Sequence, residues 1–325
     1  MRTGHQTERF PQSAVLFKFC MAVLQKRQRS TKVNDQDLGN ILKYNASDTS
    51  HWKHGKKSVK SVHALEALAK HLNTDFETLH DLSDGTLDFD EAWFEFSETE
   101  SLKDLAAKIS PEMRRIRAEH TIVLEDLATR ILAKADITSI PVFIPEVVTA
   151  LPFLEVITRD VGDKLARSTR TKPGAYSIRY RKGDMRAHTR VAIIHEISRI
   201  ILHSERQKFG LPPRIDELLP FEIELLSNAL LVPLNLLKFE FQKVSVRLDV
   251  TTALADTFWV PKSVIRSRLA QALTQTLSHD ATEFEKFVTN THAPLVTHEN
   301  LDLSEDELDD VAFGKSSGQT LASIN

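Results

Sequence analysis

The chain has 325 residues, of which 41% are apolar and 27% charged, as in ordinary globular proteins built from two or more domains. Its single cysteine, Cys20, excludes an internal disulfide and is typical of a reducing compartment. No apolar stretch approaches the ~20 residues of a membrane span, and residues 15–24 lack a signal pattern because Lys18 interrupts them and no cleavage site follows. We therefore expect a cytoplasmic protein that has no membrane partner.

The net charge of -3 conceals a strong asymmetry along the chain. Residues 1–60 contain twelve Lys and Arg side chains against four Asp and Glu side chains, a balance of +8. Residues 88–112 contain eight acidic side chains against two lysines. A basic head on an acidic chain indicates that the head binds a polyanion. The alternative is a charged face that is only solvated.

Five short helices are predicted in the basic head, because its apolar residues recur at helical spacing. They cover residues 14–27, 35–43, 47–54 and 61–72, and a last turn through Phe76, Leu79 and Leu82. Asn34 is placed to cap the second helix, and Gly55 is placed to end the third. Tyr44-Asn45-Ala46 forms a tight turn between these two helices. This arrangement is typical of a helix-turn-helix domain.

Sequence motifs run through these helices. They are Leu38-Gly39-x-x-Leu42, Asp48-Thr49-Ser50-His51-Trp52-Lys53-His54-Gly55-Lys56-Lys57, Leu65-x-x-Leu68-Ala69-x-x-Leu72 and Phe76-x-x-Leu79. At these residues the chain resembles the Xre-type family of DNA-binding domains, over about residues 12–83. It departs from the family at Lys43, where glycine is usual, and at Thr49, where a buried aliphatic residue is usual.

The resemblance implies that the third helix of the head enters the major groove of duplex DNA. The residues that would then face bases are Ala46, Ser47, Ser50 and His51. The residues that would contact phosphates are Lys53, Lys56, Lys57 and Lys60, which give affinity without reading sequence. The alternative for this region is a helical protein-interaction module of the same fold.

Four regions are predicted along the chain. They are a helix-turn-helix domain over residues 1–87, an acidic helical connector over 88–120, a small α+β domain over 121–275, and a C-terminal helix with a disordered acidic tail over 276–325. The connector is predicted to hold one short helix with Trp93, Phe94 and Phe96, and a second over residues 102–109. A strand pattern alternates Tyr176, Ile178 and Tyr180 with polar residues.

The other elements of the α+β domain follow from the same patterns. The predicted helices cover residues 123–135, 186–202 and 215–231 and form a pair within 251–273, and the predicted strands cover residues 153–159 and 175–181.

The helix over residues 186–202 carries the motif that bears on chemistry. Residues 195–199 read His-Glu-Ile-Ser-Arg, one change away from His-Glu-x-x-His, which puts two imidazoles and a carboxylate together for zinc. Arg199 takes the place of the second histidine, and a guanidinium offers no lone pair. His203 does not replace it, because eight residues of helix span ~12 Å. We expect Arg199 to pair instead with Glu196 and with a carboxylate of the next helix.

Three stretches in order carry a second resemblance. They are Arg190-Val191-Ala192-Ile193-Ile194-His195-Glu196-Ile197-Ser198-Arg199-Ile200-Ile201-Leu202-His203, Glu222-x-Glu224-x-x-x-x-Ala229-Leu230-Leu231-Val232-Pro233, and Leu254-Ala255-x-x-Phe258-x-Val260-x-x-x-Val264-x-x-Arg268-Leu269. Over about residues 121–275 the chain resembles the ImmA/IrrE family of metallopeptidase-like domains, which implies a zincin-like α+β fold. In an active member, His195 would be a metal ligand, Glu196 the base that activates water, and Glu224 or Glu222 a further ligand.

The sequence therefore predicts a mainly α chain with a small α+β domain. We expect a transcriptional regulator that binds double-stranded DNA and whose second, peptidase-like domain acts as a sensor, dimerisation or interaction module. No cofactor is expected, a regulator protein is a second candidate partner, and a homodimer is compatible with this design. One alternative is an active zinc metalloendopeptidase that cleaves a repressor, and another is a protein-interaction adaptor. Arg199 distinguishes the regulator from the metalloendopeptidase, because zinc catalysis needs another metal ligand in place of this arginine.

Overall fold

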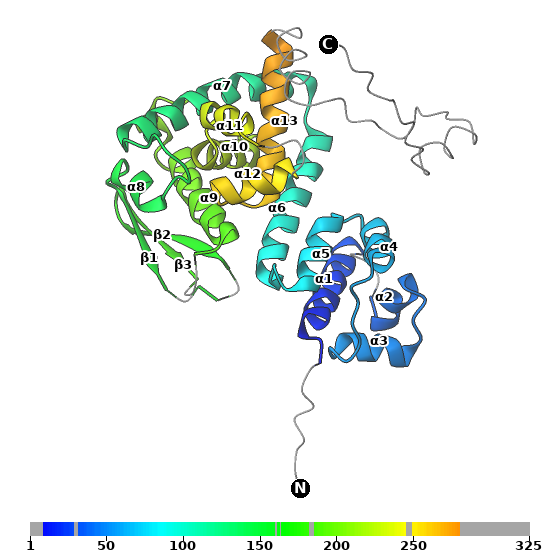
Figure 1. Ribbon diagram of the computed structural model, residues 1–325. Coiled ribbons are helices and arrows are strands. Elements are labelled where there is room, and N and C mark those ends of the chain that lie inside the picture. Colours follow the sequence, from blue (N-terminus) through cyan, green and yellow to red (C-terminus); the bar gives the residue numbers. More distant parts are fainter. Residues whose placement is uncertain are drawn as a thin grey trace, which may run out of the picture. The chain divides into compact units, whose positions relative to one another are not determined.

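The computed structural model describes residues 9–28, 32–159, 161–162, 164–181, 185–244 and 249–279, with side chains as far as residue 274 (Figure 1). The chain divides into two units, Met1–Ala272 and Leu273–Asn325. In the second unit only the end of one helix is described, so the predicted acidic tail lies outside the described residues. The described part is mainly helical with one three-stranded sheet, which confirms the predicted fold class at that level.

The first hydrophobic core is built mainly from the helices of the basic head. These are α1 (Pro11–Arg27), α2 (Asp35–Ile41), α3 (Ala46–Lys53), α4 (Val62–Leu72) and α5 (Phe76–Asp84). Of these, α2 to α5 each have a side-chain cap at the N-terminus. Asn34 caps α2, and its side chain and that of Asp37 bond each other's backbone amides in a capping box. Cys20 is fully buried in this core. Side chains at helical spacing therefore face one interior, as predicted.

The structure accommodates both departures from the Xre-type pattern, one in the turn between α2 and α3 and the other within α3. Lys43 adopts a positive φ of 56°, the conformation for which glycine is usual, so the backbone of the turn is left-handed here despite the side chain. Thr49 is buried, and its Oγ1 donates to the Asn45 carbonyl at 2.9 Å, which satisfies the hydroxyl. Gly39 fits against it, because a Cβ on Gly39 would lie 2.0 Å from Thr49 Oγ1.

The connector forms one helix, α6 (Phe89–Lys108), and not the two short helices that the sequence predicts. The polar run between its apolar halves contains no glycine or proline, so nothing in it ends a helix. One face of α6 belongs to the first core through Ala92 and Phe96, whereas Phe94 packs against the second core. The next helix, α7 (Pro111–Lys134), also begins earlier than predicted, because Ser110 caps it and Pro111 opens it.

The sheet has the strand order β1-β3-β2. Strand β1 (Leu154–Thr158) runs parallel to β3 (Ala175–Tyr180), and β2 (Ala166–Lys172) runs antiparallel to it. Strand β2 was not predicted, since its sequence is polar and mostly exposed. The predicted alternation in β3 is wrong at Ser177, which is buried together with its neighbours because β3 is the central strand.

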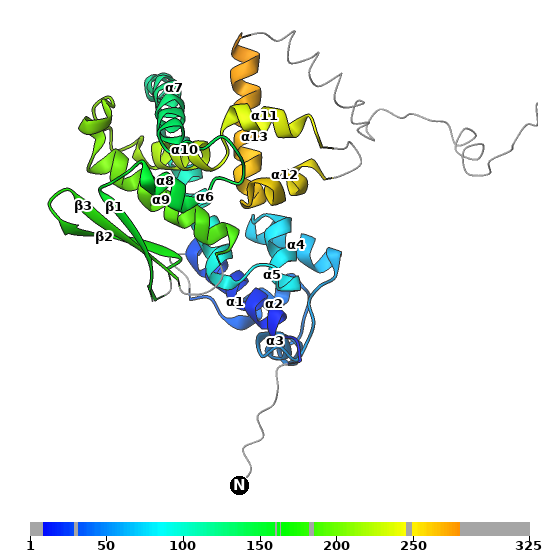
Figure 2. The same ribbon diagram turned by 60° about the vertical axis from the view of Figure 1, so that its left-hand side comes forward.

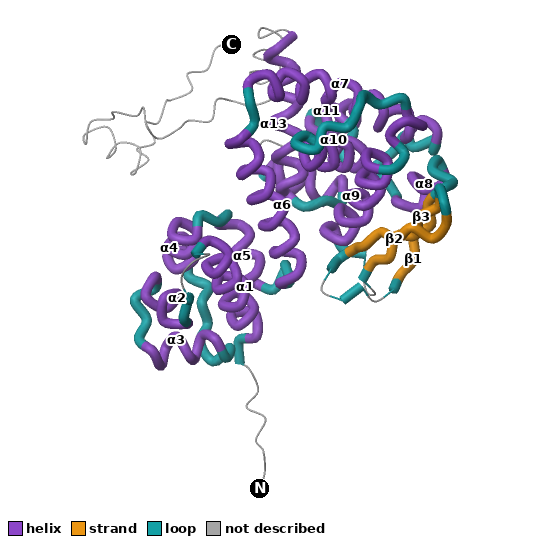
Figure 3. The backbone as a smooth tube through the Cα atoms, turned by 180° about the vertical axis from the view of Figure 1, so that it is seen from behind, coloured by secondary structure: helices purple, strands orange, loops and turns teal. Residues whose placement is uncertain are grey.

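The second core packs the remaining helices around α9 (Ala187–His203). They are α8 (Ile144–Thr149), α10 (Leu219–Leu231), which begins later than predicted, α11 (Leu234–Phe241), α12 (Val250–Phe258), α13 (Lys262–His279) and the 3-10 turn η1 (Arg206–Phe209). Helix α9 packs against β2 and β3 on one side and against α10 on another (Figure 2). The strands lie together beside these helices (Figure 3). The chemical motif thus lies on the most buried helix of this core.

Among the described residues, no single helix combines the length and the apolarity that a bilayer crossing needs. Helices α10 and α11 reach the required length and apolarity only when they are taken together, and the pair is bent by 53° at the break between the two helices.

Candidate functional sites

Helix α3 presents the four predicted base-reading residues to solvent. Ala46, Ser47, Ser50 and His51 are all exposed. The opposite side of the helix is fixed by Trp52, which is fully buried, donates from Nε1 to the Ser13 carbonyl at 2.9 Å and lies edge-on to a phenylalanine of α1. Because α3 is anchored in this way, the exposed residues form one short polar face.

Three of the four predicted phosphate-binding lysines form ion pairs within the same group of helices. Lys53 Nζ lies 2.6 Å from Asp35, Lys57 Nζ 2.9 Å from Asp48, and Lys60 Nζ 3.2 Å from Asp84. Lys57 also lies over the Tyr44 ring, with 3.9 Å from Nζ to the ring centroid. Lys56 is exposed. The pairs are partly or largely exposed, so each stabilises the fold by about 1 kcal/mol at most. A DNA phosphate has to compete with these carboxylates for the lysines. The count of charges along the sequence did not predict this competition.

Arg199 forms one of its two predicted ion pairs. Its Nη1 lies 2.8 Å from Glu196 Oε1, one turn back on α9. Its side chain is 46% exposed, so the pair is not buried. The predicted second pair, with a carboxylate of α10, is wrong: among the described residues Arg199 makes no ion pair with Glu224 or Glu222. The reason is that Arg199 projects toward solvent at the edge of the site.

Glu196 is held on both of its carboxylate oxygens. Arg199 binds Oε1, while the Ser168 amide donates to Oε2 at 3.1 Å and the Ser168 hydroxyl donates to the same oxygen at 2.5 Å. Ser168 lies on β2, the strand that sequence patterns missed. Both carboxylate oxygens of Glu196 are therefore already engaged by donors of the fold, which does not suit a residue that has to contact a catalytic water.

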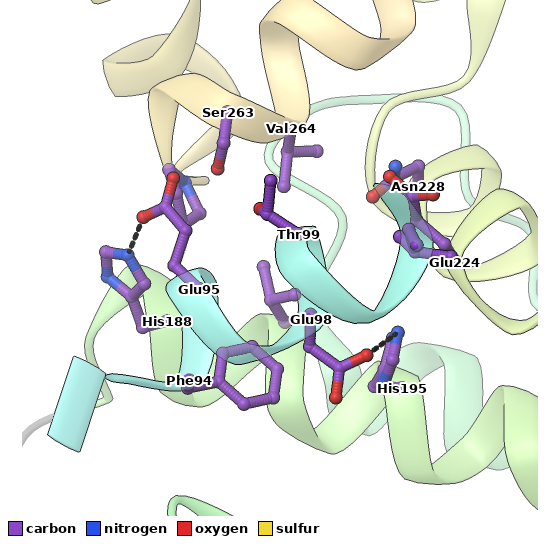
Figure 4. A pocket seen from close by; sticks show the side chains of 13 residues that line it. Phe94, Glu95, Glu98, Thr99, His188, His195, Glu224, Asn228, Ser263 and Val264 are labelled. Atoms are coloured by element: carbon purple, nitrogen blue, oxygen red, sulfur yellow. Dashed lines mark hydrogen bonds and ion pairs between the residues drawn. The ribbon is translucent and has the colours of Figure 1, made fainter. Parts of the chain in front are cut away.

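His195 points into a cavity and makes no hydrogen bond within the described structure. Its side chain is 9% exposed, its Nε2 lies 4.0 Å from Glu98 Oε2, and the Phe94 ring approaches edge-on at 6.0 Å between centroids (Figure 4). Burial, and to a smaller extent the charge of Arg199, lower the pKa of His195 to about 4. The imidazole is therefore neutral near pH 7 and has a lone pair available.

The cavity around His195 is lined by three carboxylates from two helices. Glu95 and Glu98 come from α6, and Glu224 comes from α10 (Figure 4). Glu95 is paired, because its Oε2 lies 3.1 Å from His188 Nε2. Burial raises the pKa of both Glu98 and Glu224, and a neighbouring carboxylate raises each pKa further: Glu196 acts on Glu98, and Glu98 acts on Glu224. The structure thus brings His195 and Glu224 to one cavity and adds Glu98, which sequence reasoning missed because acidic residues are common throughout the connector.

Glu222, the other suggested ligand, lies in a separate buried cluster. Its carboxylate oxygens accept hydrogen bonds from Arg206 Nη1 at 2.7 Å and Nη2 at 2.9 Å, and His120 Nδ1 lies 2.6 Å away. All three side chains are buried. Because both oxygens are engaged by this cluster, Glu222 is not free to reach His195.

The residues present do not fit a catalytic zinc ion. Zinc in peptidases needs three protein ligands around one point. Here Arg199 replaces one of them, and Glu222 belongs to the separate cluster. Among the described residues, no three His, Cys, Asp or Glu side chains converge closely enough to hold a metal ion. No protein-family model matches the chain, and no curated protein or solved structure matches it either.

Proposed function

We propose that this protein is a DNA-binding transcriptional regulator. Its first five helices bind duplex DNA through α3, and the region around α9 is a degenerate metallopeptidase-like domain that senses or binds a further molecule. A homodimer and a cytoplasmic location belong to the same proposal, since two copies of a helix-turn-helix domain commonly read two half-sites.

The observation that carries this proposal is the exposed face of α3. It combines small polar side chains with His51, all able to approach base edges, and it is flanked by lysines on the same group of helices. Small and polar side chains suit readout in a major groove, whereas phosphate contacts come from flanking cations. A helical module for protein binding would more often present apolar anchors at this position.

The peptidase alternative is disfavoured by the surroundings of its own motif. Glu196 is engaged by Arg199 and Ser168, and the second ligand position holds a cation. The expectation that no zinc is required remains a prediction, to be tested by metal analysis of the purified protein.

The test is selection of duplexes from a random pool by the full chain, followed by sequencing of the bound fraction. A preferred sequence should emerge, and His51→Ala or Ser50→Ala should change that preference. His63→Ala is the matched control, because His63 is an exposed histidine on α4. If no sequence is enriched, or if the control changes the preference as much as His51→Ala, the regulator proposal fails and the adaptor alternative takes its place.

A further inference from the structure

The cavity beside His195 contains acceptors that have no cation to match them. No Lys or Arg nitrogen among the described residues lies within 4 Å of the Glu98 or Glu224 carboxylate. Arg117 acts on Glu224, and Arg199 and Lys26 act on Glu98, all from beyond ion-pair distance. Glu224 also has side-chain hydrogen bonds from Asn228 and, at 3.5 Å, from Ser267 Oγ. Two carboxylates that burial penalises therefore face one space with no cation in direct contact.

A second observation at the same place is independent of the carboxylates. The His195 ring is nine-tenths buried, points into the cavity and has no hydrogen-bond partner among the described residues (Figure 4). A ring nitrogen that reaches a cavity without a hydrogen bond inside the fold is available to a ligand or a water molecule. A neutral imidazole donates through one ring nitrogen and accepts through the other, so its acceptor nitrogen can take a hydrogen bond from a ligand N–H.

The walls of the cavity are apolar. Phe94 and Leu102 of α6, Val191 of α9 and Val264 of α13 line it together with the acidic residues. Its volume is about 80 Å³ and part of it is open to solvent, which leaves room for several water molecules or a small ligand. The polar acceptors lie on different helices and do not converge on one point, as a bare metal ion would require.

We propose that this cavity binds a small organic cation of the amidine, guanidine or amine class, whose N–H groups reach Glu98, Glu224 and His195 and whose apolar part lies between Phe94 and Val264. This inference names a ligand class for the sensor role proposed above. It rests on that proposed function only for the biological role of the ligand. A charged donor is held in a low-dielectric site by charge-assisted hydrogen bonds, which are stronger than neutral ones. Glu95 contributes less, because His188 already pairs with it.

Benzamidine is a suitable probe, and benzamide is its neutral isostere. Binding to the full chain is measured by calorimetry in the absence of DNA. Benzamidine should bind at least about tenfold more tightly than benzamide, since the loss of one buried charge-assisted bond corresponds to a factor of this order. Glu98→Gln and Glu224→Gln should each weaken benzamidine binding by about tenfold, with unchanged affinity for benzamide. Asp104→Asn, at an exposed position of the same helix α6, is the matched control.

Three outcomes would overturn the site. They are equal binding of benzamidine and benzamide, an equal loss in Asp104→Asn, and stoichiometric zinc that displaces benzamidine. The comparison of the two ligands on the unaltered chain needs no variant, so a variant that fails to fold leaves the test intact. Because DNA is absent from the measurement, a failure here is distinct from a failure of DNA binding.

Discussion

Arg206→Ala should destabilise the protein far more than Arg199→Ala, because the two arginines serve carboxylates in different surroundings. Arg206 is 8% exposed and binds Glu222, which is 3% exposed, through both terminal nitrogens. Its removal leaves a buried carboxylate whose one remaining side-chain partner among the described residues is His120. Stranding a buried charge in this way costs roughly 3–5 kcal/mol of unfolding free energy.

Arg199 differs in its exposure. Its side chain is 46% exposed, and its partner Glu196 keeps both hydrogen bonds from Ser168 when the arginine is removed. An exposed pair of this kind contributes about 0–1 kcal/mol. The sequence predicted that Arg199 pairs with two carboxylates, an arrangement that would have made its removal more costly.

The assay is urea denaturation of wild type and both variants, followed by circular dichroism. Arg130→Ala is the control, because it removes an exposed arginine that pairs with Asp126 on α7. We expect Arg199→Ala to match this control and Arg206→Ala to unfold at clearly lower urea. If Arg199→Ala costs as much as Arg206→Ala, the Arg199–Glu196 pair is buried and the description of the α9 site is wrong.

Three further predictions concern the two sites. The pKa of His195 is lowered from 6.5 to about 4, so the folded state binds this proton less tightly than the unfolded chain does. The neutral His195 therefore contributes on the order of 3 kcal/mol to the unfolding free energy, which is present above pH 6.5 and lost as the pH falls toward 4. His195→Gln should remove this part of the acid dependence in thermal melts. Gly39→Ala should lower the melting temperature, because its Cβ would lie 2.0 Å from Thr49 Oγ1, and Thr49→Ala in the same chain should restore much of the loss. Zinc should stabilise Arg199→His, in which His-Glu-x-x-His is restored near Glu224, and leave wild type unchanged in parallel melts; equal stabilisation of both would mean that the ligands are misplaced.

The helices of the basic head are readable from sequence because their signals are local. Asn34, Ser61 and Asp75 each cap a helix whose apolar face follows within one turn. Strand β2 gave no such signal. It is a polar edge strand, and its pairing with β3, not its own residues, determines that it is extended.

Only part of the candidate site could be predicted from the sequence, for the same physical reason. Motif spacing on α9 identified His195, Glu196 and the replacement at residue 199. The partners that decide their chemistry lie far away in sequence, since Ser168 reaches Glu196 from β2 and Glu98 reaches His195 from α6. Such contacts depend on tertiary packing, and no local pattern predicts them.

The salt dependence of duplex binding tests the DNA-binding proposal most directly. Each phosphate contact releases a counterion, so the logarithm of the affinity should fall linearly with the logarithm of salt concentration, with a slope of about -0.9 per contact. Replacement of Lys53, Lys56 and Lys57 by alanine should reduce the magnitude of this slope by about 2.7. Lys70 is an exposed lysine on α4, and Lys70→Ala should leave the slope unchanged. A full chain with no salt-dependent affinity for duplex DNA, or a slope that the triple replacement does not change, would contradict the proposal.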